Sequence, residues 1–131
     1  MLFRSRIDLQ IEVPRLPPSD LRPDGAASES SDTVRGRVEI ARAVQTQRAG
    51  KANAQLTQSE TNTHCRLQPR DQLLLERAIE SLQLSARSMH RILRVARTIA
   101  DMAASAAIDT AHLTEALGYR RADRDMGQQA A

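Results

Sequence analysis

Aromatic residues and cysteines are almost missing from this chain of 131 residues. Phe3 and Tyr119 are the aromatics, 2% of the sequence, and tryptophan is absent. The core must therefore consist of Leu, Ile, Val, Ala and Met, a composition that favours packed helices over a β-sandwich. The single cysteine, Cys65, cannot form an internal disulfide, which is typical of a protein in a reducing cytosol.

Long hydrophobic runs are missing as well. No segment approaches the roughly 18 apolar residues of a membrane-spanning helix. The N-terminal sequence MLFRSRIDLQ lacks the uninterrupted apolar core of a signal peptide. We therefore expect a cytoplasmic protein without a membrane partner. The net charge of +3 is too small to establish nucleic-acid binding by itself.

The motifs of nucleotide-hydrolysing and metal-dependent enzymes are absent from the sequence. The pair Gly50-Lys51 has no glycine five positions before Gly50, so it is not a phosphate-binding loop. No hydrophobic strand ends in Asp-Glu to hold magnesium. The residue types that bind zinc are present, but their spacing does not form a zinc site: His64, Cys65, His90 and His112. This chain alone is expected to be no enzyme and to bind no metal or cofactor.

The first part of the chain contains one strand-like segment and a linker. Residues 7–13, IDLQIEV, alternate apolar and polar side chains, which predicts a single strand with no partner strand in the chain. Residues 14–31 are rich in Pro, Ser, Asp and Gly, and the prolines block both helix and sheet. We expect an extended linker there.

Everything from residue 32 onward has a helical pattern. A first helix, capped by Ser31 or Asp32, should run to about Gly50. Its apolar face is formed by Val34, Val38, Ala41 and Val44, and Gly36 weakens it by about 1 kcal/mol relative to alanine.

Four further helices are expected. Thr57 and Glu60 have the spacing of a capping box at the start of a short second helix. A third helix begins at Pro69 and a fourth after Ser85. A fifth, capped by Asp109 or Thr110, should end near Gly118. Together they predict an all-α helical bundle of about four to five helices.

The fourth helix carries four arginines in residues 84–101, LSARSMHRILRVARTIAD. At about 100° per residue, Arg87, Arg91 and Arg94 lie on the face opposite the apolar stripe, with Arg97 furthest round. A solvated helix face, a contact to nucleotide phosphates and a contact to the DNA backbone all fit this pattern, because the guanidinium fork binds two phosphate oxygens.

Three stretches carry a resemblance to a known family: SRIDLQIEVPRLPPSDL, ESSDTVRGRVEIARAVQTQRAGKANAQLT and LSARSMHRILRVARTIADM. They resemble the C-terminal part of the magnesium-chelatase-like AAA+ ATPases, in the YifB/ComM competence-protein branch, from about Arg6 to Tyr119. The resemblance implies a hexameric ATPase that acts on DNA in natural transformation and recombination. The chain would then be a C-terminal lid fragment, which senses nucleotide in the hexamer and is non-catalytic alone.

The resemblance implies a division of the chain and a set of partners. Residues 1–13 would be the last strand of the AAA+ core, 14–31 a flexible linker, 32–119 the helical lid, and 120–131 a disordered tail. The implied partners are the AAA+ core and neighbouring subunits of a hexamer, with DNA as a further candidate. ATP and magnesium would be cofactors of the full-length ATPase, not of this chain alone.

The resemblance also implies roles for particular residues. Arg6 aligns with a candidate arginine finger, although MLFRS replaces the family's usual approach to that position. Arg87 matches the sensor-2 arginine at the start of a lid helix, and Arg91 and Arg94 would support it or face a neighbouring subunit. Arg97 is expected to be solvated. Asn53 matches a family motif without a physical role that the sequence reveals.

Two other functions remain open at this point. The chain could be a small DNA-binding module whose arginine face grips phosphates, or the lid of a true magnesium-chelatase subunit. A DNA module would lose affinity by roughly 0.9 log units per contacted phosphate for each log unit of salt.

Overall fold

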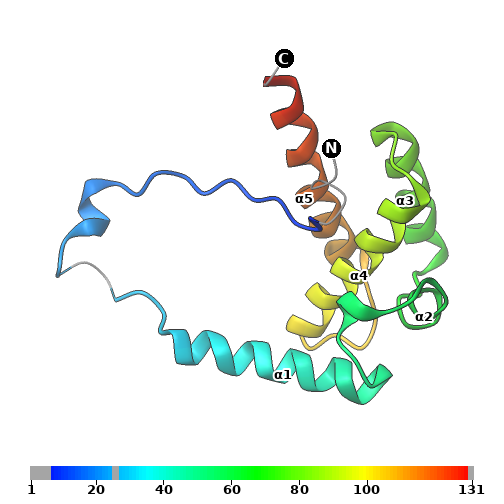
Figure 1. The fold of residues 1–131 in the computed structure, drawn as a ribbon, viewed down its shortest axis with the longest axis horizontal. Helices are drawn as coiled ribbons and strands as arrows, with labels where there is room; N and C mark the ends of the chain where they lie inside the picture. The colour runs from blue at the N-terminus through cyan, green and yellow to red at the C-terminus, as the bar shows by residue number, and fades with distance from the viewer. Residues whose placement is uncertain (1–6, 25–26, 130–131) are drawn as a thin grey trace.

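The computed structural model describes residues 7–24 and 27–129, and every helix in it belongs to one bundle or to the loop that enters it. The elements in chain order are η2 (Pro18–Leu21), α1 (Ser31–Ala49), η3 (Asn53–Gln55), α2 (Gln58–His64), α3 (Pro69–Leu82), α4 (Ala86–Met102) and α5 (Thr110–Gln129). These residues contain no strand (Figure 1). The predicted all-α bundle of four to five helices is confirmed.

Local hydrogen bonds begin the helices where the sequence predicts. Thr57 and Glu60 form the complete capping box of α2. The Ser85 side chain accepts from the backbone N–H of Ser88 and caps α4. The Ser30 side chain caps α1, one residue before the expected position, by accepting from the N–H of Thr33. Each cap satisfies an N–H group that has no partner inside the helix.

Helix α4 is the centre of the bundle, because α1, α2, η3 and α5 all pack against it. Its buried residues follow the helical period, and the apolar ones form one core cluster with buried side chains of α3 and α5. Among the described residues, no aromatic side chain belongs to this core, as the composition predicts. Its buried members are Leu56, Cys65, Leu75, Ile92, Leu93, Ala96, Ala100, Ile108, Leu113, Ala116 and Leu117.

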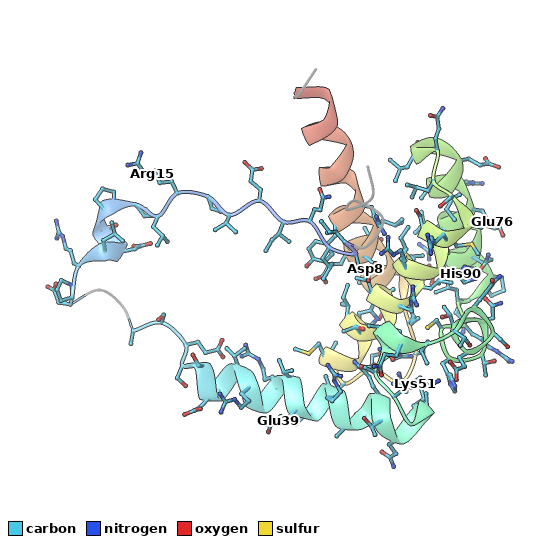
Figure 2. The ribbon with its side chains drawn as sticks, in the orientation of Figure 1. Asp8, Arg15, Glu39, Lys51, Glu76 and His90 are labelled. Carbon is cyan, nitrogen blue, oxygen red and sulfur yellow. The ribbon has the colours of Figure 1, made fainter. Side chains whose placement is uncertain are left out.

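The segment before α1 is a wide loop. Residues 7–17 have no regular secondary structure, so the predicted strand is absent from the described part of the chain. A strand requires a neighbouring strand for its backbone hydrogen bonds, and residues 7–24 and 27–129 contain no strand that could pair with it. The chain leaves the bundle near α5, reaches η2 at its far point and returns to the start of α1 (Figure 1). In Figure 2, Arg15 lies well away from the bundle, whereas Asp8 lies against it.

Two helices differ from expectation. The valines of the α1 apolar face are 39–47% exposed, and Ala41 is the member of that face that is buried. Helix α5 continues to Gln129, so its expected end near Gly118 is wrong and the chain beyond residue 120 is helical to that point. A glycine in a helix interior costs only about 1 kcal/mol, and a Cβ at Gly118 would meet no atom within 4 Å.

Candidate functional site

The start of α4 forms a basic pocket on the surface. Its volume is about 310 Å³, and Gln58, Thr61, Ala86, Arg87, His90 and Arg94 line it. Ser85 ends the preceding turn in an extended conformation, which places Arg87 in the first turn of the helix. Arg87 is exposed. The N–H groups of a helix N-terminus, together with two guanidinium groups, create a positive potential that favours an anion.

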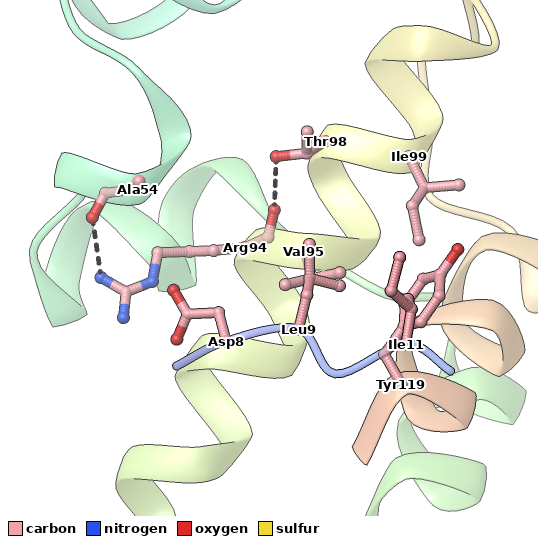
Figure 3. Close-up of a pocket in the computed structure, with 9 residues that line it drawn as sticks. All are labelled: Asp8, Leu9, Ile11, Ala54, Arg94, Val95, Thr98, Ile99 and Tyr119. Atoms are coloured by element: carbon pink, nitrogen blue, oxygen red, sulfur yellow. Dashed lines mark hydrogen bonds between the residues drawn. The ribbon is translucent and has the colours of Figure 1, made fainter. Parts of the chain in front are cut away.

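Arg94 connects the basic pocket to η3 and the residue that follows it through hydrogen bonds. Its Nη1 donates hydrogen bonds to the backbone carbonyl of Leu56, at 2.9 Å, and to that of Ala54, at 3.4 Å. These bonds fix the guanidinium beside η3 (Figure 3). The structure therefore brings two of the predicted residues, Arg87 and Arg94, to one pocket.

His90 lies one turn after Arg87 in the same pocket. Its Nδ1 donates to the backbone carbonyl of Ala86 at 2.9 Å, because a carbonyl can only accept. This bond fixes the ring, and Nε2 is the nitrogen left to meet a ligand. In the sequence this histidine belongs to no recognisable motif, so sequence reasoning did not group it with the arginines.

Arg91 lies outside the basic pocket and is paired elsewhere. Its Nε is 2.6 Å from the Asp8 carboxylate, and its side chain is 12% exposed. Asp8 comes from the segment before α1, so this ion pair holds residues distant in sequence together. The structure thus separates Arg91 from Arg87 and Arg94, although all three share one face of α4.

Arg97 corrects the expectation that it is solvated. It is 3% exposed. Its Nε donates to Asp101 at 3.2 Å, and its two Nη atoms donate to the carbonyls of Ser105, at 2.7 Å, and Ala106, at 3.1 Å. Burial lowers the pKa of Arg97, and the Asp101 carboxylate opposes that shift. The wheel position of Arg97 was right, but the loop from α4 to α5 folds back over it.

Asp101 is the centre of a buried polar network that sequence reasoning missed. Arg48 from α1 pairs with its carboxylate through both Nη atoms. Asn53 donates to Asp101 at 2.9 Å and to Thr98 at 3.1 Å, and its backbone N–H donates to the Gln45 side chain at 3.0 Å. The network joins α1, η3 and α4 and supplies the physical role of Asn53. The residues of this network form no recognisable motif in the sequence, because they come from separate elements.

Arg94 also lines a second cavity. Its volume is about 440 Å³, and mainly apolar side chains from the segment before α1, α4 and α5 line it. We call it the apolar groove, and its residues are Asp8, Leu9, Ile11, Ala54, Arg94, Val95, Thr98, Ile99 and Tyr119 (Figure 3).

The described residues do not support a metal site or a nucleophilic cysteine. They contain no group of three His, Cys, Asp or Glu side chains that could hold a metal ion. Burial raises the pKa of the Cys65 thiol to about 11, so it is a poor nucleophile at neutral pH. No helix in this part of the chain is long and apolar enough to cross a membrane. Arg6, the candidate arginine finger, lies outside the described residues.

The fold and the site together define an all-α helical domain with a basic surface pocket at the N-terminus of α4. Over residues 28–120 the sequence matches the C-terminal domain of the magnesium chelatase subunit ChlI, and the chain belongs to this family. The family resemblance noted in the sequence is therefore confirmed.

Curated relatives place the chain near one branch of the family. It is 48% identical over 118 residues to the competence protein ComM of Haemophilus influenzae, which covers 90% of this chain and 23% of the relative. It is 43% identical over 122 residues to the protein YifB of Escherichia coli, covering 93% of this chain and 24% of the relative. The chain thus spans about a quarter of the length of these relatives.

Proposed function

We propose that this chain is the C-terminal lid of a magnesium-chelatase-like AAA+ ATPase of the competence-protein type, and that it senses nucleotide through Arg87. The observation that carries the proposal is the meeting of Arg87 and Arg94 in one exposed pocket at the start of α4. Arg87 contacts the nucleotide phosphates, and Arg94, held by two carbonyls, supports the positive potential.

Catalysis belongs to the rest of the ATPase in this proposal. A separate AAA+ core binds ATP and magnesium, and the lid reports the state of the phosphates to it. The exposed valines of α1 and the exposed apolar side chains before it support a larger assembly, because a free domain gains nothing from exposing them. In this proposal the assembly is a cytoplasmic hexamer that acts on DNA, as the family resemblance of the sequence implies.

The test compares two arginines at equivalent helix positions. Arg87 and Arg70 are each the second residue of a helix and are both exposed, but only Arg87 lines the basic pocket. In the multi-domain ATPase, Arg87→Ala should reduce the hydrolysis rate at least about tenfold, because one charge-assisted contact contributes about 1.5–3 kcal/mol. Arg70→Ala should leave the rate unchanged. An unchanged rate in Arg87→Ala would reject the sensor role.

The DNA-binding module is less well supported by the contacts of the arginine face. Arg91 is paired with Asp8, Arg94 donates to backbone carbonyls, and Arg97 is buried. Arg87 alone of the four has an exposed side chain for a DNA phosphate. A fluorescence anisotropy titration of this chain with duplex DNA at two salt concentrations tests the point, and tight binding with a steep salt dependence would favour the DNA module.

The lid of a true magnesium-chelatase subunit is the other alternative. The matched family takes its description from that enzyme, but the 42–48% identity to ComM and the YifB proteins favours the competence branch. Restoration of ATPase-dependent transformation by a ComM carrying this lid would support the competence branch. Restoration of magnesium insertion into a tetrapyrrole by a chelatase carrying it would support the alternative.

A further inference from the structure

We propose that His90 is a second phosphate-binding residue of the basic pocket, beside Arg87, and that it binds the anion as a protonated imidazolium. Anion binding then takes up one proton from solvent. The inference rests on the proposed function, since it concerns the same pocket, and it names the residue that makes nucleotide sensing depend on pH.

His90 lies between the two arginines of the pocket. Arg87, His90 and Arg94 stand at positions i, i+3 and i+7 of α4, so they form one stripe along the helix. All three line the pocket, whose volume is about 310 Å³. An anion that contacts Arg87 in the first turn of α4 therefore lies about one helical turn, roughly 5.4 Å along the axis, from the imidazole.

The bond to Ala86 determines which nitrogen of His90 can meet the anion. Nδ1 donates to the Ala86 carbonyl at 2.9 Å, so Nδ1 carries a proton. In the neutral ring Nε2 then has a lone pair, which repels a phosphate oxygen. In the imidazolium Nε2 is an N–H donor and forms a charge-assisted hydrogen bond with that oxygen. The anion therefore selects the protonated ring.

The pocket has no carboxylate in its lining within the described part of the chain. Beside His90, the charged groups that line it are Arg87 and Arg94, whereas Gln58 and Thr61 of α2 are uncharged. Carboxylates on the neighbouring segments are paired with other cations: Asp8 with Arg91, and Glu60 with Lys51. The bound anion thus supplies the negative charge that offsets two guanidinium groups and the imidazolium.

Histidine is the side chain of this lining that changes charge near neutral pH. Arginine stays charged, and hydrogen bonds, first that from Lys51, lower the pKa of Glu60 on α2 to about 2, so this carboxylate stays ionised as well. His64, the other titratable group of α2, is half-buried and does not line the pocket. Since the protonated ring binds the anion better, affinity should rise as the pH falls and decrease as the pH rises through the range in which histidine loses its proton.

The test is an NMR titration of the full 131-residue chain with sulfate at about pH 6 and about pH 8, values that span the range in which histidine changes charge. Sulfate is a tetrahedral dianion like phosphate, but its own charge is constant over this range. Any change in affinity therefore belongs to the protein. We expect sulfate to shift the side-chain signals of Arg87 and His90, with a dissociation constant about tenfold lower at the acid pH, the effect of one charge-assisted hydrogen bond.

Three variants assign the pH dependence to one residue. His90→Gln should bind sulfate weakly and equally at both pH values. His90→Arg, which introduces a permanent cation, should bind tightly at both, and loss of folding cannot produce such a gain at the alkaline pH. His64→Gln makes the same change at a half-buried histidine outside the pocket and should keep the pH dependence of the parent chain.

The outcomes separate this inference from the proposed function. Sulfate binding without pH dependence, or a dependence that His90→Gln retains, would overturn the role of His90 and leave the sensor role of Arg87 unaffected. No sulfate binding at either pH, or binding that Arg87→Ala does not weaken, would overturn the inference at the level of the anion site itself. The sensor role is decided separately, by the hydrolysis rate of Arg87→Ala in the multi-domain ATPase.

Discussion

Asn53 connects η3 to two helices, α1 and α4, through hydrogen bonds of its side chain and its backbone. It is 2% exposed and bonds to Gln45 of α1 and to Thr98 and Asp101 of α4. Asp101 brings two arginines, Arg48 and Arg97, into the same buried network. At the scale of single residues, stability here depends on complete hydrogen bonding of buried polar groups.

The first prediction concerns that network. Asn53→Ala removes the side-chain bonds to Thr98 and Asp101, whereas its backbone N–H still donates to Gln45. We therefore expect the free energy of unfolding to fall by about 2 kcal/mol. Urea denaturation followed by circular dichroism measures the change. Asn62→Ala, an exposed asparagine on α2, is the matched control and should change stability by less than about 0.5 kcal/mol. Equal values for the two variants would contradict the structural role of Asn53.

Arg87 and Arg97 show why a helical wheel is insufficient at this scale. Both lie outside the apolar stripe of α4, but Arg87 is exposed and Arg97 is covered by the following loop. The wheel predicts which side of a helix faces the core. It cannot predict which loop folds over the other side.

The elements themselves follow local rules closely. The capping box of α2, the serine cap of α4 and the proline at the start of α3 were all predicted from short motifs. Helix α1 forms where local rules predict, but its packing differs from expectation, because its valines stay exposed and only Ala41 of its apolar face is buried. Two predictions belong to this scale.

Helix α1 contains one glycine in its interior and ends at another. Gly36→Ala should stabilise α1 by up to about 1 kcal/mol, since a Cβ there meets no atom within 4 Å. Gly50 has φ of 71°, so Gly50→Ala should destabilise it by about 1 kcal/mol. Amide hydrogen exchange of α1 measures both effects. An increase in exchange for Gly36→Ala would show that the position needs a glycine for another reason.

The capping box of α2 should be sensitive to acid. The hydrogen bond from Lys51, followed by those from Thr57, lowers the pKa of Glu60 from 4.5 to about 2. A folded-state pKa below the unfolded one stabilises the fold above pH 4.5, and this contribution is lost as the pH falls towards 2. Glu60→Gln should therefore reduce stability at neutral pH and flatten its decline over that range.

Urea unfolding at a series of pH values checks the role of Glu60. The control is Glu39→Gln, which removes an exposed carboxylate from α1 and should retain the decline of the parent chain. If Glu60→Gln loses stability with acid as steeply as the parent chain does, the capping box is not the source of the sensitivity.

At the scale of the whole molecule, the core is one cluster around α4. Cys65 belongs to it and is 2% exposed, so its thiol reports on opening of the entire bundle. A hydrogen bond from the Thr110 hydroxyl to the Asp71 carboxylate, at 2.6 Å, also joins α5 to α3.

Cys65 should react slowly until the bundle unfolds. Burial raises its pKa from 9.0 to about 11, which reduces the thiolate about a hundredfold beyond the effect of poor access. Alkylation by iodoacetamide should follow the global unfolding curve in urea. Ser59→Cys on the exposed face of α2 is the comparison and should be alkylated rapidly without denaturant. Rapid alkylation of Cys65 in the native protein would show that the core opens locally.

The helix starts, to within a residue, the all-α class and the family were determined by the sequence itself, because caps, periodicity and shared family motifs are local features of the sequence. Only the tertiary structure decided how the arginines of α4 divide. Arg87 and Arg94 share a pocket, Arg91 holds Asp8, and Arg97 is buried beside Asp101. These partners come from segments distant in sequence, and their identity depends on how loops pack, which local patterns do not encode.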